Sequence, residues 1–481
     1  MARWMISFSQ TIVTLFLALI SNSLIKPIDC LPRSPLQENS NSPTITASAS
    51  SPTSTPFVNK CDISYGDSAV PIYNCNQVSA KAIDSLIQTQ TSLNESPTPF
   101  QIQFTCTASS ILCTKAKNGF QRAFQSISSA LKIYTPIIVG AKFISFCNSS
   151  LSSSCESTKN TLGQASATSY YTAIDDNGNS VLYPQALIKQ MSMDALPTYS
   201  STDITAQFNA DADFWFTGDG PMSSTQYHFE YVITHELIHG MGFATSWRNY
   251  FNSEYLTPMP KTIIQKGTNS NNNEIQIQGW MSPFIFDTFL IDSKTKTSLM
   301  IASQAITSIT PPSTTNSMTF SSFQSLLESS STALSAAKTI YRLATTPDES
   351  ISFQIPPFEL GSNKNALVPL ETSLSPYIPG SSICHLSNSL TNTADFLMRA
   401  KLENGISLSD LMKNNNQQYG VLGPRLIAIL QAMGWPTEAN PNQIVRVFDT
   451  KNSAQSHHQF LGILLGMIFP ILTTLFSMIF L

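Results

Sequence analysis

Two histidines and a glutamate at short spacing are the residues of this chain best suited to chemistry. His235-Glu236-x-x-His239 lies within the largely apolar stretch 231–243. Side chains four residues apart lie on one face of a helix, so two imidazoles one turn apart can hold one metal ion. Glu236 would lie beside them and could polarise a metal-bound water. These residue types at this spacing predict a helical zinc site.

The residues around this motif predict a buried helix. The chain contains only six histidines, so the spacing seldom arises by chance. A buried helix with two hydrogen-bonded histidines is the alternative, but it leaves Glu236 unexplained among apolar neighbours. Ser223-x-x-Gln226 has the spacing of a capping box, which predicts that the helix begins there. Gly240 and Gly242 fit the end of a helix, where a left-handed residue is needed.

A catalytic zinc ion takes three protein ligands and keeps one position open for water, so a third ligand is required. In one large class of zinc site it is a histidine three residues after the glycine that ends the helix motif. This chain has Thr245 at that position, and threonine is a poor zinc ligand. The third ligand must therefore come from outside the motif. Among the carboxylates, Glu254 and Asp287 are alternatives.

Only one of the remaining histidines suits the third position. His228 lies seven residues before His235, on nearly the same helix face but about 10 Å along the axis, too far to share one ion. His457 and His458 lie in the predicted anchor region near the end of the sequence. This elimination leaves His385 as the predicted third ligand.

Hydrophobic patterning predicts the elements that would position these residues. Phe120, Phe124, Ile127 and Leu131 recur at helical spacing, which predicts an amphipathic helix whose apolar stripe is core. Alternating or continuous apolar runs predict strands. The predicted strands are 101–106, 136–143, 210–216 and 279–291, the predicted helices are 115–133, 321–344 and 424–433, and 180–191 is predicted to be a strand that turns into a short helix.

The sequence His235–Phe243 (HELIHGMGF), followed much later by His385 and Asp395-Phe-Leu-Met398, resembles the metzincin zinc peptidases. It is most similar to the leishmanolysin-type branch, which inserts a long segment before its third histidine and has a Met-turn after it. The resemblance implies that Met398 lies beneath the zinc ion, with an ordinary core methionine as the alternative. The chain also resembles poorly characterised secreted metalloproteinase-like proteins of fungi and other lower eukaryotes.

The predicted elements and this resemblance together imply an α+β fold. The implied architecture is a zincin, metzincin-like catalytic domain with a twisted mixed sheet over the zinc helix and a mostly helical or irregular C-terminal subdomain. The predicted segments are a signal peptide (1–23), a Ser/Thr/Pro-rich linker (24–57), an N-terminal catalytic subdomain with the zinc helix (58–249), a cleft-forming insertion (250–380), a C-terminal catalytic subdomain with the third ligand and Met-turn (381–440), a spacer (441–459) and a hydrophobic anchor signal (460–481).

The N-terminal residues and the cysteines indicate export. Residues 1–23 have the basic start and the apolar core of a secretory signal peptide. The chain has eight cysteines, and an even number fits disulfide formation in an oxidising compartment, although eight cysteines allow many connectivities. The pairs closest in sequence are Cys61–Cys75, Cys106–Cys113 and Cys147–Cys155.

The C-terminal residues predict attachment to a membrane. The stretch 460–481 has no charged residue and is long enough to span a bilayer. Asn452 and Ser453 precede a polar spacer, which fits a glycolipid-anchor signal; a retained tail-end membrane helix is the alternative. Asn94 and Asn148 begin glycosylation sequons, so we expect a glycoprotein at the extracellular cell surface. A net charge of −4 provides no basic field for nucleic acid, which is excluded as a partner.

The predicted chemistry is the hydrolysis of protein or peptide substrates. Zn²⁺ would lower the pKa of its bound water from 15.7 to about 7, and Glu236 would act as general base and later deliver the proton to the leaving amine. The sequence therefore predicts a secreted or cell-surface zinc-dependent endopeptidase, a metalloprotease. Two other functions stay open: a catalytically inactive surface binding or adhesion protein on the same scaffold, and a non-peptidase zinc hydrolase. The presence of Glu236 argues against the inactive scaffold, which needs no base.

Overall fold

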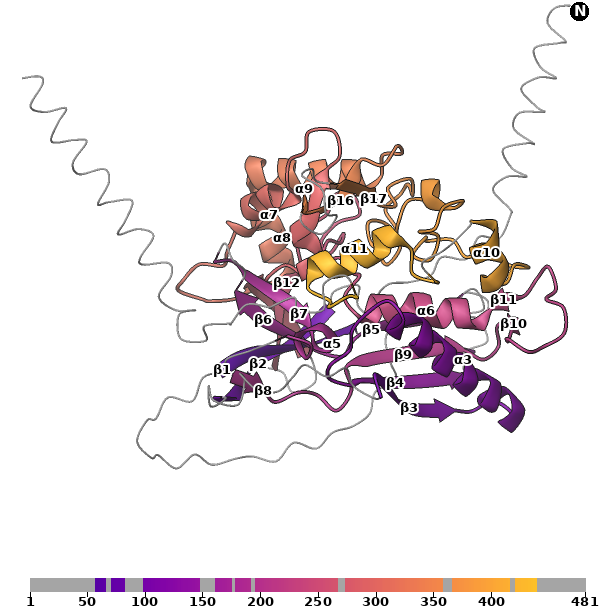
Figure 1. Cartoon of the computed structure of the whole chain (residues 1–481). Helices are drawn as coiled ribbons and strands as arrows, with labels where there is room; N and C mark the ends of the chain where they lie inside the picture. The colour runs from indigo at the N-terminus through magenta and orange to yellow at the C-terminus, as the bar shows by residue number, and fades with distance from the viewer. Residues whose placement is uncertain are drawn as a thin grey trace, which may run out of the picture.

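A computed structural model describes most of the chain between residues 57 and 438, and this part has an α+β fold with several sheets (Figure 1). The described residues are 57–65, 71–82, 98–147, 161–174, 178–191, 195–266, 273–357, 366–415 and 420–438. The predictions that lie outside them concern the signal peptide 1–23, the linker up to residue 56, the sequons at Asn94 and Asn148, the anchor candidates Asn452 and Ser453, His457 and His458, and the tail 460–481.

A four-stranded mixed sheet supports the helix that carries His235 and His239. Its strands are β3 (Phe100–Cys106), β4 (Ile137–Ile144), β9 (Ile204–Asn209) and β5 (Gly163–Ala167). Their order is β3-β4-β9-β5, with β3, β4 and β9 parallel and the edge strand β5 antiparallel to β9. Burial alternates along β4, as it does in a strand with one face on the core. The strand predictions 101–106 and 136–143 are confirmed.

Two helices cover one side of this sheet. Helix α3 (Ser110–Ser128) packs beside helix α6 (Phe229–Gly240), and Figure 1 shows both above β4 and β9. Helix α3 begins several residues before the predicted start because Ser109 caps it, accepting a hydrogen bond from the backbone N–H of Leu112 at 3.3 Å. The predicted apolar stripe is confirmed as core by the burial of Phe120, Phe124, Ile127 and Leu131.

A second, five-stranded sheet has the order β7-β6-β1-β2-β8. Its strands are β1 (Phe57–Tyr65), β2 (Pro71–Ala82), β6 (Tyr170–Ile174), β7 (Ser180–Pro184) and β8 (Ala195–Pro197). Strand β7 leads directly into helix α5 (Gln185–Ile188), so the prediction of a strand turning into a short helix is confirmed.

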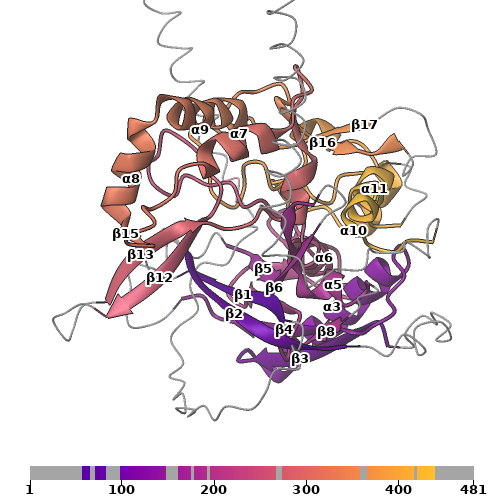
Figure 2. The same ribbon diagram turned by 90° about the vertical axis from the view of Figure 1, so that its left-hand side faces the viewer.

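Residues 250–380 contain further sheets and helices (Figure 2). One sheet joins β12 (Pro260–Lys266), β13 (Asn273–Trp280) and β15 (Met318–Thr319), and the other joins β14 (Leu290–Asp292), β16 (Ile351–Ile355) and β17 (Ala366–Pro369). The helices are α7 (Leu299–Thr307), α8 (Phe320–Ser329) and α9 (Ser331–Ala344). Whether this region forms a cleft stays a prediction.

Three element predictions need correction. The predicted strand 279–291 is strand only at its two ends, and its middle contains a 3-10 helix, η1 (Ile285–Phe289), where the buried Asp287 accepts several hydrogen bonds. The predicted helix 321–344 is divided at Ser330, which has extended backbone and whose side chain caps α9. Of 210–216, only β10 (Phe214–Trp215) is strand. In each case tertiary contacts or a local cap override the apolar pattern.

The C-terminal part lies over α6 on the side opposite the sheet (Figure 1). It includes η3 (Asn388–Leu390), α10 (Leu408–Asn414) and α11 (Pro424–Met433). The predicted helix 424–433 is confirmed: proline stands at its first turn, and Gly434 ends it with φ +117°.

Disulfides join the two cysteine pairs closest in sequence among the described residues. Cys61 bonds to Cys75 across β1 and β2, and Cys106 bonds to Cys113. Cys147 is also disulfide-bonded, while its predicted partner Cys155 lies outside the described residues. In the described ranges, no helix has both the length and the apolar character needed to cross a membrane.

Candidate metal centre

Helix α6 carries His235 and His239 in the interior of the protein. All of its residues except Glu230 are buried. A helix that is buried on all its faces must be covered by other elements on several sides. Figure 1 shows α6 between the four-stranded sheet and the segment that carries α11.

The helix begins after the N-cap residue His228, and not at the predicted capping box. Tyr227 and His228 form β11, which pairs in parallel with β10, so strand pairing holds these residues extended. Ser223 and Gln226 form a local turn in which Gln226 Oε1 accepts a hydrogen bond from the Ser223 N–H at 3.0 Å. The capping-box prediction is wrong, because a strand separates that turn from the helix.

The glycines at the helix end have different roles. Gly242 has φ +110°, the left-handed region that the helix-end pattern requires, and a Cβ there would lie 2.8 Å from Pro184 Cγ. Gly240 is still helical. A Cβ on Gly240 would lie 2.4 Å from Ile204 Cγ2, so glycine allows α6 to approach β9 closely.

The structure brings His385 to the two histidines of α6. The Nε2 atoms of His235 and His239 are 3.1 Å apart. Nε2 of His385 lies 3.1 Å from that of His235 and 3.2 Å from that of His239. All three side chains are fully buried. Within the described ranges, this is the group of His, Cys, Asp or Glu side chains that lies close enough together to share an ion.

Backbone carbonyls orient the three rings through their other nitrogens. The contacts are His235 Nδ1 to Leu397 O at 2.8 Å, His239 Nδ1 to Phe243 O at 2.7 Å and His385 Nδ1 to Ser381 O at 3.0 Å. A carbonyl oxygen can only accept, so each Nδ1 carries the proton and each neutral ring presents a lone pair at Nε2. Three lone pairs this close repel one another, whereas a cation placed between them would be coordinated by all three.

Burial keeps these rings neutral. Desolvation lowers the pKa of His235 to about 4. Desolvation, followed by the neighbouring rings, lowers the pKa of His239 well below the usual 6.5, and the same causes lower the pKa of His385. The three imidazoles are therefore unprotonated at Nε2 near pH 7, which is the state that binds metal.

The donor set fits a zinc ion. Two nitrogens at about 2.0–2.1 Å from a tetrahedral ion lie about 3.3 Å apart. The 3.1–3.2 Å separations found here are close to that value. The three buried histidines could thus bind one metal ion and leave one coordination position open. Glu236, which follows the first histidine, is fully buried as well.

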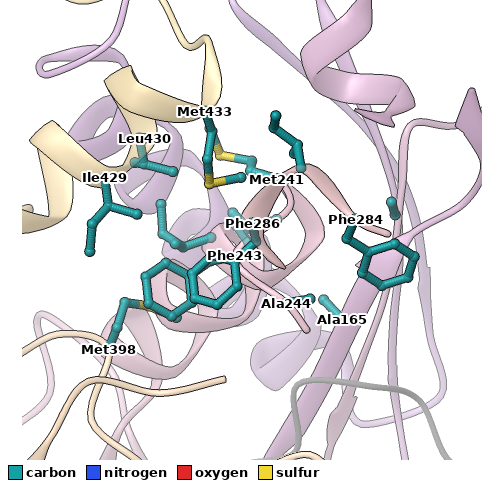
Figure 3. Close-up of a cluster of buried hydrophobic side chains, with 14 of the residues drawn as sticks. Ala165, Met241, Phe243, Ala244, Phe284, Phe286, Met398, Ile429, Leu430 and Met433 are labelled. Atoms are coloured by element: carbon teal, nitrogen blue, oxygen red, sulfur yellow. The ribbon is translucent and has the colours of Figure 1, made fainter. Parts of the chain in front are cut away.

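Met398 lies in the turn that orients the first histidine. Its neighbour Leu397 accepts the hydrogen bond from His235. The Met398 side chain is fully buried, and Figure 3 shows it in one apolar cluster with Phe243 and with residues of α11. Burial suits both a methionine beneath the ion and an ordinary core methionine, so the first role stays a prediction.

The carboxylate alternatives for the third ligand are used elsewhere or exposed. Glu254 is exposed. Asp287 is buried and accepts hydrogen bonds from Thr245 Oγ1 at 2.6 Å, Ser246 Oγ at 2.5 Å, and the N–H groups of Ser246 and Phe284. Burial raises the pKa of Asp287 to about 6, against the effect of these hydrogen bonds. Thr245 stands where one large class of zinc sites has its third histidine, three residues after the glycine. Here it instead anchors the chain after α6 to Asp287.

His228 connects two parts of the fold. Its Nδ1 accepts a hydrogen bond from the backbone N–H of Leu408 at 2.7 Å, so its Nε2 carries the proton and lies 3.0 Å from Thr217 Oγ1. Burial, and then nearby Arg122, lowers its pKa to about 4. His228 therefore links the start of α6 to α10.

Two buried polar residues beside the site were missed by the sequence reasoning. The Tyr231 hydroxyl lies 3.0 Å from both Phe396 O and Leu397 O. Its position four residues before His235 puts both side chains on one helix face, which is a signal that the sequence does contain. Arg399 is only 2% exposed, whereas an isolated arginine in a sequence predicts a surface residue.

Fold and site define an α+β protein with three buried histidines placed to bind a metal ion. A family model described as SPBPB7E8-like matches residues 45–450, and the chain belongs to this family. It is similar to the uncharacterized protein PB7E8.01 of Schizosaccharomyces pombe, with 23% identity over 342 residues, 67% of this chain and 59% of the relative's length. No solved structure matches the chain. Neither description states an activity, so the argument about function depends on the site.

Proposed function

We propose that this protein is a zinc-dependent endopeptidase with a metzincin-like catalytic domain, acting on protein or peptide substrates. One observation carries the proposal: three neutral imidazoles bring their Nε2 atoms within 3.2 Å of one another, next in sequence to a buried glutamate. A structural zinc site usually has four protein ligands, whereas a catalytic site has three and an open position. A set of three histidines therefore supports a catalytic site over a structural one.

His235, His239 and His385 would hold the ion. A bound Zn²⁺ supplies Lewis acidity toward a carbonyl oxygen and lowers the pKa of water. Glu236 accepts the proton of the attacking water on its carboxylate and delivers it to the amide nitrogen as the peptide bond breaks. The buried apolar neighbours of Glu236 on α6 exclude bulk water, which strengthens electrostatic interactions in the site.

Two disulfides between described cysteines support export to an oxidising compartment. Location at the extracellular surface is part of the proposal.

A binding or adhesion protein on the same scaffold is the second candidate. The observation that favours it is the burial of the site: the four side chains of the motif and third ligand are fully buried. In such a protein the ion would be structural, and Glu236 would have no proton to move.

The test compares the unmutated protein with Glu236→Gln. Casein and a peptide library are incubated with each protein, with and without a chelator, and bound zinc is measured in parallel. We expect chelator-sensitive cleavage by the unmutated protein, and in Glu236→Gln retention of zinc with cleavage reduced at least about 100-fold, since the general base is removed. Stoichiometric zinc without cleavage in the unmutated protein would favour the binding protein.

A further inference from the structure

The turn at residues 396–398 joins the segments that carry the first and third histidines. The Leu397 carbonyl oxygen accepts the Nδ1 proton of His235 at 2.8 Å. The Met398 carbonyl oxygen accepts a hydrogen bond from the N–H of Leu386, the residue after the third histidine, at 2.7 Å. A displacement of this turn would therefore move two of the three ligand nitrogens together.

Two buried polar side chains contact this turn. The Tyr231 hydroxyl is placed to donate to Phe396 O or Leu397 O, each at 3.0 Å, and the side chain is 1% exposed. Arg399 Nε donates to Phe396 O at 3.0 Å, and its Nη1 donates to Thr391 Oγ1 at 2.9 Å. The carbonyl oxygens of Phe396 and Leu397, the two residues before the methionine, thus each have a buried side-chain donor in addition to the contact between His235 and Leu397 O.

Tyr231 reaches the turn from the same helix face as the first histidine. Its ring and that of His235 are nearly parallel, with centroids 6.5 Å apart, and Leu397 O lies within hydrogen-bond distance of both. The hydroxyl therefore fixes the position of the acceptor that sets the rotation of the imidazole. A ligand held in place in the free protein has less conformational entropy to lose on binding an ion.

Arg399 also contacts the turn, through the same Phe396 carbonyl oxygen that Tyr231 reaches. A buried guanidinium costs several kcal/mol unless its donors are satisfied, and in Arg399 Nε and Nη1 have partners whereas Nη2 has none among the described residues. Its contacts are with the turn itself, with Thr391, and with Glu403 at 3.4 Å, so its planar fork ties the turn to neighbouring segments. Lysine has the same charge but lacks this fork.

We propose that Tyr231 and Arg399 are positioning residues for the metal site. They hold residues 396–398 so that His235 and His385 keep the separation that an ion needs. This inference rests on the proposed metal site and is independent of the substrate.

The test measures zinc affinity of the full-length protein by competition with a chromophoric chelator. Tyr231→Phe and Arg399→Lys preserve net charge and most of the side-chain volume but remove hydrogen bonds to the turn. Loss of a group that orients a metal-binding histidine lowers affinity about 10- to 100-fold, and we expect this for each variant. The control is Tyr171→Phe, which removes an equally buried hydroxyl bonded to Gln185 and Thr198, and should leave zinc affinity unchanged.

The outcomes separate this inference from the proposed function. Zinc affinities of Tyr231→Phe and Arg399→Lys within about twofold of the unmutated value would overturn the positioning role and leave the metal site intact. An equal loss in Tyr171→Phe would also overturn it, because general destabilisation would explain the effect. No zinc binding by the unmutated protein would overturn the metal site itself. The visible spectrum of the Co²⁺-loaded Tyr231→Phe variant is a second readout, and we expect its bands to shift.

Discussion

At the residue scale, the three Nε2 atoms form a nearly equilateral triangle with sides of 3.1–3.2 Å. Each ring is oriented by a carbonyl from a different segment: the end of α6, the loop before the third histidine, and the turn that contains the methionine. Burial lowers the pKa of all three. Metal binding should therefore depend on every ring of the triangle and on no exposed carboxylate.

The third ligand can be tested by a pair of substitutions. His385→Ala removes one of three nitrogens, so we expect zinc affinity to fall by about two orders of magnitude or more. Glu254→Ala alters an exposed carboxylate and should retain a full equivalent of zinc. Metal content after dialysis, measured by mass spectrometry, checks both. Zinc lost from Glu254→Ala but kept by His385→Ala would show that the ligand set is wrong.

At the scale of elements, α6 has to end abruptly so that its last turn can be oriented by the chain that follows. The Phe243 carbonyl that orients His239 lies directly after Gly242, whose left-handed conformation reverses the backbone. Thr245 and Ser246 then donate to Asp287 and fix the next residues. The helix end is thus part of the candidate metal site.

Gly242→Ala tests this helix end. Alanine at φ +110° is strained, and its Cβ would contact Pro184 Cγ at 2.8 Å, so we expect a loss of about 2–4 kcal/mol in unfolding free energy. Gly218→Ala is the matched control: φ is +104°, but no atom lies within 4 Å of its Cβ, so only strain of about 1 kcal/mol remains. Urea denaturation measures both. Equal losses in the two variants would show that the contact with Pro184 has no effect.

At the scale of the whole molecule, the C-terminal part docks across the start of α6. His228 accepts a hydrogen bond from the Leu408 N–H, and the N–H of Gly405 donates to Gln226 O at 2.8 Å. These contacts join segments about 180 residues apart in sequence. They attach the C-terminal part to the start of α6, so the stability of this docking should depend on the protonation of His228.

The pH dependence follows from the lowered pKa of His228. Its folded-state pKa is about 4, against 6.5 as the usual value, so the unfolded chain binds the proton first as pH falls. Its contribution, on the order of 3 kcal/mol, is complete above about pH 6.5 and is lost as pH falls toward 4. His228→Asn keeps an acceptor for the Leu408 N–H but cannot titrate. In metal-free protein, we expect urea denaturation to show a shallower pH dependence for this variant, and identical slopes would contradict the role of His228.

Local signals explain which elements could be predicted. Helix 424–433 has proline at its start and Gly434 at its end, and strands 101–106 and 136–143 have a clear apolar pattern; the structure confirms all three. The apolar run 279–291 failed as a strand because the buried carboxylate of Asp287 needs donors from another segment. The capping-box prediction was wrong because β11 pairs with β10 at the place where the helix was expected to begin.

The sequence by itself determined which histidines could share a metal ion. A spacing of four residues places His235 and His239 on one face of any helix, and the scarcity of histidines pointed to His385 as their partner. Only the tertiary structure decided that the three Nε2 atoms meet, which tautomer each ring has, and that Tyr231 and Arg399 hold the turn between them. The reason is physical: helix periodicity is a local property, whereas the meeting of residues about 150 apart depends on how the sheet, α6 and the C-terminal part pack together.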